Sequence, residues 1–264
     1  MLTRVLTDPL SLAAAQAGVT GLLALMVAYI AWRWQLHVER EIVISLARGL
    51  VQVVVVGTVL LFIFRGPFAV GILVLLFMIF LAAHMAARRA EDLPDAFRVS
   101  LYSILIGSGV LIGIMVFLGV IETRLTVFIP VSSMLIANSM NTASLAFNRF
   151  RGELVAHRGH IEAALALGAA PQAAVMPYIR AAVLASLIPR VDSLRSLGIV
   201  WIPGVMTGML LGGSHPVQAA FYQFVIVALI LTVSAITAIT AVLLMSRRIF
   251  TRAEQLRPEV LGSP

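Results

Sequence analysis

The sequence predicts an all-α integral membrane protein, on the basis of its composition and the length of its apolar segments. Of 264 residues, 61% are hydrophobic and 12% are charged, with a mean hydropathy of +1.03, which lies far outside the soluble range. Apolar stretches of about 20 residues cross a bilayer of about 30 Å as helices. About seven occur, and they leave little sequence for a soluble domain, so we expect one transmembrane domain over residues 1–264. The predicted spans are Leu12–Trp32, Ile42–Phe64, Pro67–Ala87, Val99–Ile121, Leu125–Phe147, Ser196–Gly213 and Val217–Ser246.

The first span is expected to be retained rather than cleaved as a signal peptide. It is longer than a typical signal core, and no small-x-small cleavage site precedes the aromatic end at Trp32 and Trp34. Cysteine is absent, which excludes disulfides and thiolate metal sites.

Arginine distribution predicts the orientation of the chain. All 19 basic residues are Arg, and with the N-terminus outside, the outer segments hold only Arg4, Arg65 and Arg124. The remaining arginines fall on the inner side, including a basic cytoplasmic tail at residues 247–264, so the C-terminus is expected inside. Because topology accounts for the net charge of +7, a lipid bilayer is the expected environment and nucleic acid is not an expected partner.

The fifth predicted span, Leu125–Phe147, is unusually polar. Met134, Asn138 and Asn141 follow an i, i+4, i+7 pattern and share one helix face. Such side chains are costly in a bilayer unless they face protein or a wet cavity. They either line a translocation path or form hydrogen bonds that hold helices together, and both interpretations stay open. The polar residues of this span are Ser132, Ser133, Asn138, Ser139, Asn141, Thr142 and Ser144.

The sixth predicted span should be broken near Pro203, because proline removes a helix hydrogen bond and clashes with the preceding turn. Glycines at Gly204, Gly208 and Gly212 predict close helix packing. A broken helix lining a path is the alternative, with Met206 and Thr207 beside the break.

Two polar residues one turn apart, Arg48 and Gln52, lie in the inner half of the second span. Arg48 either extends its guanidinium to the inner headgroups or pairs with an acidic group of the coupling region or with substrate.

No catalytic constellation is present in the sequence. There is no Gly-x-x-x-x-Gly-Lys-Ser/Thr loop and no His-Glu-x-x-His motif, so the chain is not expected to be an enzyme or to hydrolyse nucleotide by itself. His157 and His160 are three residues apart, but with no third ligand nearby they do not predict a metal site, and metal ligands stay unknown.

A polar segment at about residues 148–195 interrupts the apolar sequence on the inner side. Gly168 and Pro171 bound a short helix, about Gly159–Leu167, and a second helix should start at about Gln172. Ile161, Ala164, Leu165 and Gly168 share one face of the short helix. Its alanine-rich composition favours binding to a protein rather than resting on lipid, where bulky residues are preferred.

The end of this segment, Arg190–Arg195, is expected to begin a helix at the inner face. Asp192 suits a helix N-terminus and can pair with Arg195 or Arg190. This is either a helix-terminal network or a charged elbow that transmits motion to Pro203 and Gly204.

Several motifs resemble those of one transporter family. The order Glu162-Ala163-Ala164 followed by Gly168 is similar to the coupling helix of ABC-transporter permeases. Further runs, together with this one, resemble the Fet-type permeases, bacterial iron-export or metal-resistance subunits with plant aluminium-tolerance relatives, over about Ile42–Arg248. These runs are Ser45–Gln52, Asn138–Thr142, Ile188–Ser193, Pro203–Gly208 and Gln218–Gln223.

The resemblance implies a permease subunit in the cell (inner) membrane, acting as a homodimer with a separately encoded cytosolic ATPase that binds ATP and Mg. Arg195 stands where relatives are expected to have Lys, and Trp201 where a small residue is usual. ATPase coupling would fall to Glu162, Ala163, Ala164, Gly168, Asp192 and Arg195, and the path to Arg48, Gln52, Met134, Asn138, Asn141, Pro203, Gly204, Met206 and Thr207.

The substrate stays open at this point. Iron prefers carboxylate, imidazole and oxygen donors, whereas these spans offer mainly Asn, Ser, Thr and Met. Iron, another metal, a metal chelate or a non-metal solute are alternatives. A non-transporting membrane scaffold that recruits a cytosolic partner is a further alternative, and an ion-driven transporter ranks last because intramembrane acids are not evident.

Overall fold

The computed structural model describes residues 9–35, 37–90, 93–251 and 253–257. These ranges are almost entirely helical and contain no β-sheet, only the isolated bridges Leu197–Trp201 and Phe250–Leu256, so the predicted all-α class is confirmed. Arg4 and residues 258–264 of the predicted tail lie outside the described residues. The chain forms two compact units, Met1–Arg65 and Gly66–Pro264, and the single domain of the sequence analysis stays a prediction.

The first unit is a pair of helices, α2 (Pro9–Arg33) and α3 (Glu39–Ile63), which pack on each other and agree with the first two predicted spans. Glu39 and Glu41 in the first turn of α3 suit the positive end of its dipole. Most outward side chains of α3 are Val, Leu and Ile, as expected of a helix that contacts acyl chains.

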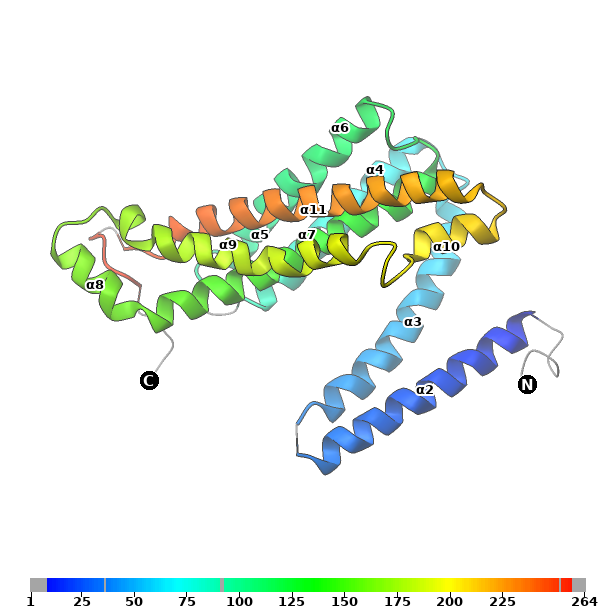
Figure 1. Ribbon diagram of the computed structural model, residues 1–264, viewed down its shortest axis with the longest axis horizontal. Helices are drawn as coiled ribbons and strands as arrows, with labels where there is room; N and C mark the ends of the chain where they lie inside the picture. Colours follow the sequence, from blue (N-terminus) through cyan, green and yellow to red (C-terminus); the bar gives the residue numbers. More distant parts are fainter. Residues whose placement is uncertain (1–8, 36, 91–92, 252, 258–264) are drawn as a thin grey trace. The chain divides into compact units, whose positions relative to one another are not determined.

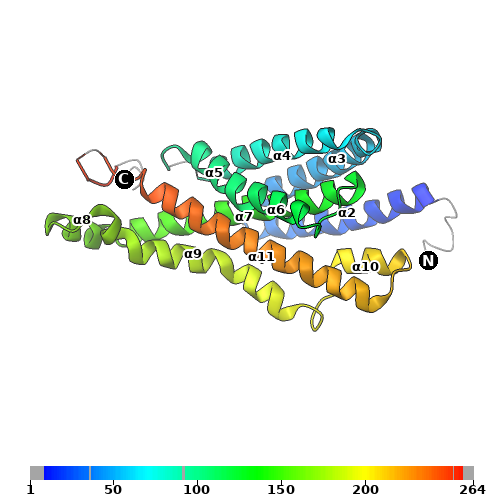
Figure 2. The same cartoon turned by 90° about the horizontal axis from the view of Figure 1, so that it is seen from above.

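The second unit is a helical bundle in which α7 (Leu125–Ala156) and α11 (Pro216–Ser246) form the middle layer. Helix α9 (Pro171–Ser196) packs against α7 and α11. On the opposite side α4 (Phe68–Arg88) packs on α7, and α5 (Ala96–Ile104) packs on α11 and α7 (Figures 1 and 2). The predicted spans Pro67–Ala87 and Val217–Ser246 therefore match α4 and α11 closely.

The fourth predicted span contains a π-helical turn. Helix α5 continues through η1 (Leu105–Val110) into α6 (Leu111–Phe117). At Gly107 the backbone of η1 meets Thr237 of α11 so closely that an added Cβ would overlap the threonine side chain. Thr237 in turn donates a hydrogen bond to Ser139 of α7 (3.1 Å), so three elements meet at one buried point.

The predicted sixth span, Ser196–Gly213, is wrong. In its place α9 is a continuous helix of 26 residues, about 39 Å long, which is enough to cross a bilayer. The sequence analysis did not predict α9 as a span because its charged residues and two internal prolines, Pro177 and Pro189, lower its mean hydropathy. Helix α10 (Gly204–Leu211) has eight residues, about 12 Å, and is too short to cross by itself.

Six described helices are long and apolar enough to cross a membrane by length and composition. Helix α7 is not among them, although it has 32 residues, because its polar side chains lower its hydropathy. The count of seven spans and the orientation therefore stay predictions. The arginine tally also changes, since Arg190 and Arg195 lie near the end of α9 that is remote from the predicted inner segment.

Candidate functional site

A nine-residue helix, α8 (Arg158–Ala166), connects α7 to α9 at one end of the second unit, while α10 lies at the other end (Figure 1). His157 ends α7 and precedes α8 with φ −115° and ψ 21°, a non-helical conformation that lets the chain change direction. Gly168 follows α8 with φ +87°, which glycine adopts without steric cost. The predicted short helix therefore forms, within one residue of its predicted bounds.

The two faces of α8 differ as the sequence predicts. Ile161 is fully buried, and Ala164 and Leu165 are half-buried against the bundle. Gly168 is the exception on this face, since it is exposed. The outward face presents Glu162, Ala163, Ala166 and Leu167.

Leu167 is a residue that sequence reasoning missed. It is 89% exposed at the C-terminal end of α8, so its apolar side chain is free to contact a partner. The signal was available, because Leu167 lies off the Ile161 face of the helix. Beside it Glu162 accepts a hydrogen bond from Arg158 Nε (2.7 Å), which holds its carboxylate on the outward surface.

The junction of α7, α8 and α9 is tied together by aromatic rings. His157 stacks on Tyr178 of α9 with ring centroids 4.7 Å apart, and on His160 at 6.0 Å. Its Nδ1 lies 3.5 Å from Glu153 Oε2. No group of three His, Cys, Asp or Glu side chains suited to a metal occurs in the part of the chain that the structure describes. The stack on Tyr178 and the contact with Glu153 connect the turn before α8 to both α7 and α9.

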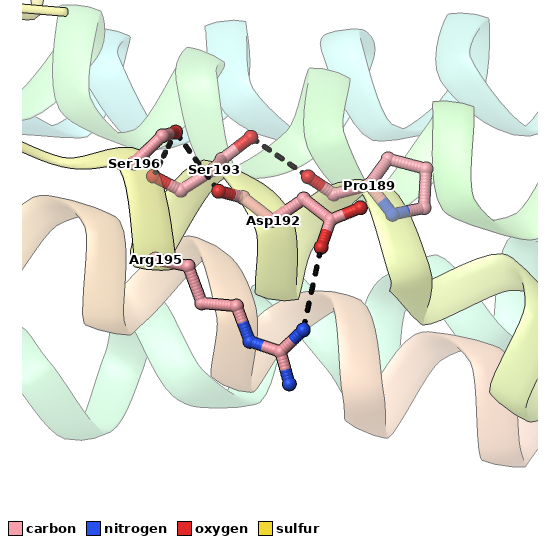
Figure 3. A network of polar contacts seen from close by, with 5 residues as sticks. All are labelled: Pro189, Asp192, Ser193, Arg195 and Ser196. Carbon is pink, nitrogen blue, oxygen red and sulfur yellow. Dashed lines mark hydrogen bonds and ion pairs between the residues drawn. The ribbon is translucent and has the colours of Figure 1, made fainter. Parts of the chain in front are cut away.

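Asp192 and Arg195 do not lie beside α8. The predicted helix start at Arg190 is wrong, because α9 runs unbroken from Pro171 to Ser196 and carries both residues to its far end. There Arg195 Nη1 is 3.7 Å from Asp192 Oδ1, and both side chains are exposed (Figure 3). Their role in coupling stays a prediction, and any such role must act along the length of α9.

Serine hydroxyls complete this network at the end of α9. Ser193 donates to the carbonyl of Pro189 (2.7 Å), and Ser196 donates to that of Asp192 (2.9 Å) (Figure 3). The indole N–H of Trp201 donates to Ser196 Oγ (3.1 Å). The two hydroxyls bond back to carbonyls one turn earlier in α9, and the indole bond attaches the following loop to the helix. The charged segment thus belongs to a polar network at the C-terminal end of α9, and its role as an elbow stays a prediction.

Helix α7 separates its polar residues onto two faces. Ser132, Ser139 and Thr142 are buried within the bundle, which fits the packing interpretation for these hydroxyls. Asn141 is exposed, while Met134 and Asn138 are half-buried, so the predicted common face points away from the core. The amide of Asn138 donates to the carbonyl of Met134 (2.8 Å), which satisfies part of its polarity locally. The path function of this face stays a prediction.

The break predicted at Pro203 is confirmed. Helix α9 ends at Ser196, and buried Pro203 precedes the first residue of α10 with φ −69° and ψ 154°. Thr207 Oγ1 donates to the Pro203 carbonyl (3.2 Å). Within the part of the chain that the structure describes, an added Cβ at Gly204 or Gly208 meets no heavy atom within 4 Å, so these two glycines make no close helix contact there.

Gln223 of α11 is a second residue that sequence reasoning left without a role. Its side chain is only 4% exposed, and Oε1 accepts a hydrogen bond from the backbone N–H of Met206 (3.1 Å). The amide therefore satisfies one of the free donors at the start of α10. No sequence pattern predicts the contact between Gln223 and Met206, which are 17 residues apart on different helices.

Arg48 and Gln52 belong to the first unit. Both are exposed on α3, four residues apart and therefore one turn apart on one face. Their assignment to a path stays a prediction.

Comparison with known proteins identifies a family and several relatives of this chain. A model of the family described as Uncharacterised protein family (UPF0014) matches residues 14–250. Protein ALUMINUM SENSITIVE 3 of Arabidopsis thaliana is 33% identical over 250 residues, covering 94% of this chain and 90% of the relative. The probable iron export permease protein FetB of Escherichia coli (strain K12) is 31% identical over 236 residues, covering 89% and 91%. The membrane protein STAR2 of rice (Oryza sativa subsp. japonica) is 32% identical over 245 residues, covering 92% and 86%.

The chain is thus a multi-pass cell-membrane protein, as its apolar helices and relatives show, and it belongs to the UPF0014 family. The resemblance to Fet-type permeases stated from its motifs is confirmed. No solved structure matches it significantly.

Proposed function

We propose that this chain is the permease subunit of an ABC transporter, which exports a metal with energy from a separately encoded ATPase. The observation that carries the proposal is α8, a short helix at the turn between two long helices, with one face buried and the other exposed. A relative over most of the chain is named a probable iron export permease. The chain itself has no phosphate-binding loop, so ATP and Mg would bind the partner.

The contacts of α8 suit a mechanical role. Ile161 seats the helix in the bundle, and the His157–Tyr178 stack connects its start to α9. A force applied to the exposed face would therefore reach α7 and α9 together, because packed interiors transmit displacement rather than absorb it. Helix α9 then leads to the broken segment before α10.

The half-buried face of α7 supports a path between two copies of the chain. A face carrying Asn138 and Asn141 is costly against acyl chains, so protein or a wet cavity should cover it. In a homodimer, two such faces would border one cavity. Amide oxygens and the Met134 thioether are the donors that this face offers to a metal or its chelate.

The proposal is tested by purifying the tagged chain from membranes of its source organism and identifying the nucleotide-hydrolysing subunit that accompanies it. Glu162→Lys and Gly168→Arg should abolish this association and the stimulation of ATP hydrolysis. Glu162→Gln and Gly168→Ala are the matched controls. Glu162→Gln removes the carboxylate without reversing its charge, and Gly168→Ala introduces the backbone strain at φ +87° without the bulk and charge of arginine. Wild-type coupling in both charged variants would refute the proposal.

A non-transporting scaffold is the second candidate, because an exposed partner-binding helix alone does not require a path. The two candidates differ in the α7 face. Asn138→Leu with Asn141→Leu should stop metal export from loaded proteoliposomes while the ATPase still binds, if the chain transports. Unchanged cellular function with these variants, together with loss of function in the α8 variants, would favour the scaffold.

A further inference from the structure

The segment after α11 is folded, although the sequence predicted only a basic tail. Residues 249–251 and 253–257, named here the C-terminal hairpin, are closed by a Phe250–Leu256 bridge. Backbone hydrogen bonds join Thr251 N–H to Gln255 O (2.8 Å) and Arg257 N–H to Ile249 O (2.9 Å). Ile249 is fully buried and Leu256 is 8% exposed, so the hairpin is anchored in the second unit.

The hairpin is held near the end of the bundle by Arg248, which lies two residues after the end of α11. Arg248 Nη1 donates to Asp95 Oδ2 (2.7 Å), which joins the residue before the hairpin to the start of α5. The start of the hairpin is therefore attached to the bundle through this ion pair.

The hairpin and α8 form the two walls of a hollow of about 690 Å³. From α8 and the turn after it come Glu162, Leu165 and Gly168. The hairpin contributes Ala253, Glu254 and Gln255, all three of which are exposed. The hollow thus borders the outward face of α8, the surface proposed above to bind the ATPase.

The charge of the hollow is opposite to that of the chain. Among the described residues that line it, both charged side chains, Glu162 and Glu254, are carboxylates. Arg158 neutralises part of the charge on Glu162, and Glu254 has no such bond among the described contacts. The hollow is bordered both by the C-terminal end of α8 and by the N-terminal end of α9 at Ala170 and Pro171, so the opposite dipoles of the two helix ends offset each other and its charge rests on the side chains. An acidic hollow in a chain of net charge +7 is suited to a cationic group.

Three candidate ligands of the hollow, namely a lipid headgroup, the end of this chain and a segment of the ATPase, differ in charge. An anionic lipid headgroup would be repelled by the two carboxylates. The remaining residues of the chain beyond Arg257 offer Glu259 and no base, so this sequence does not complement the hollow either. A basic segment of the cytosolic partner does.

We infer that the hollow between α8 and the C-terminal hairpin is a second part of the ATPase-binding surface, and that it receives a Lys- or Arg-bearing segment of the ATPase. This inference rests on the proposed function. On this inference, α8 is the contact that moves with the ATPase, while Glu254 of the hairpin fixes the position at which the ATPase binds.

The test uses single cysteines, for which the cysteine-free chain gives no background. Ala253→Cys reports on the hairpin wall, Leu167→Cys on the tip of α8, and Thr123→Cys on the exposed loop before α7 at the opposite end of that helix. Each variant is alkylated with a maleimide, with and without the purified ATPase subunit recovered in the co-purification. With the ATPase present, alkylation should slow by roughly tenfold in Ala253→Cys and Leu167→Cys, because the thiol reacts only while the ATPase is dissociated. The rate in Thr123→Cys should stay unchanged.

The outcomes separate this inference from the proposed function. Slowing in Leu167→Cys without slowing in Ala253→Cys would overturn the hollow as a binding site and leave the coupling helix in place. Absence of slowing in both would overturn the proposed function as well. Equal slowing in all three variants would indicate non-specific masking and count against the inference.

A charge variant checks the chemistry of the occupant. Glu254→Lys should weaken ATPase binding by roughly tenfold at low salt, and Glu254→Gln by about threefold, with both effects shrinking as ionic strength rises. Equal affinities for Glu254→Lys and wild-type chain, measured by titration with the same purified subunit, would show that no basic group enters the hollow.

Discussion

Replacement of Gly107 by alanine tests the meeting point of η1 and α11. An added Cβ would overlap Thr237 Oγ1 and lie 3.1 Å from Thr237 Cβ and 3.2 Å from its Cα. Rotating the threonine removes the first overlap but not the other two, because these atoms belong to or adjoin the backbone of α11. The helices must therefore separate slightly for the variant to fold.

The magnitude follows from three contributions. Overpacking of a filled core costs about 1–3 kcal/mol. Displacing Thr237 also endangers its hydrogen bond to Ser139, which contributes about 0.5–1.5 kcal/mol. Alanine returns about 1 kcal/mol through its better helix propensity. The net loss is about 0.5–3.5 kcal/mol, and a protein of this size loses about 2–4 °C in Tm per kcal/mol.

The assay is thermal unfolding of the purified chain in detergent, monitored by the fraction that stays monodisperse. Gly113→Ala is the matched control, because an added Cβ there meets no heavy atom within 4 Å, and its Tm should hold or rise. Combining Gly107→Ala with Thr237→Ala removes the nearest oxygen and should recover part of the loss. Equal Tm values for the Gly107 and Gly113 variants would refute the close approach of η1 and α11.

Three further predictions concern the links between elements. Gln223→Leu removes the acceptor for the Met206 N–H, which should cost α10 about 0.5–2 kcal/mol and speed its hydrogen exchange; unchanged exchange would show that the bond is not formed. Ile161→Ala should lower the stability of α8 packed against the bundle by about 2–5 kcal/mol, and Ile161→Val by about 1 kcal/mol. Stimulation of the ATPase should therefore fall more in Ile161→Ala than in Ile161→Val. Arg248→Gln breaks a half-exposed pair with Asp95 and should lower stability by at most about 1 kcal/mol, with a smaller effect at high salt; a large loss would mean that this pair is not exposed to solvent.

The polar residues of α7 show where sequence reasoning stops. The pattern of Met134, Asn138 and Asn141 predicted a common face, but not whether that face would be buried. The structure assigns packing to the opposite set, since Ser139 bonds to Thr237, 98 residues away in the chain. Periodicity reports the angle between residues on one helix and carries no information about which neighbour covers each side.

The segment after α8 shows a second limit. Arg190, Asp192 and Arg195 suggested a charged elbow that begins a helix at the inner face, whereas they lie in the last two turns of a helix long enough to cross the membrane. Mean hydropathy treats these charges as evidence against a span. At the end of a long helix, however, arginine side chains can extend to an interface, so they do not exclude one.

The sequence by itself determined the membrane class, most of the crossing helices, the break at Pro203 and the amphipathic character of α8, because each depends on composition or spacing within one segment. Only the tertiary structure decided the crossing of α9, the Gly107–Thr237 approach, the Gln223 contact to α10 and the hairpin wall beside α8. These depend on which distant segments come together, and that choice is made by the packing of whole helices rather than by any local pattern.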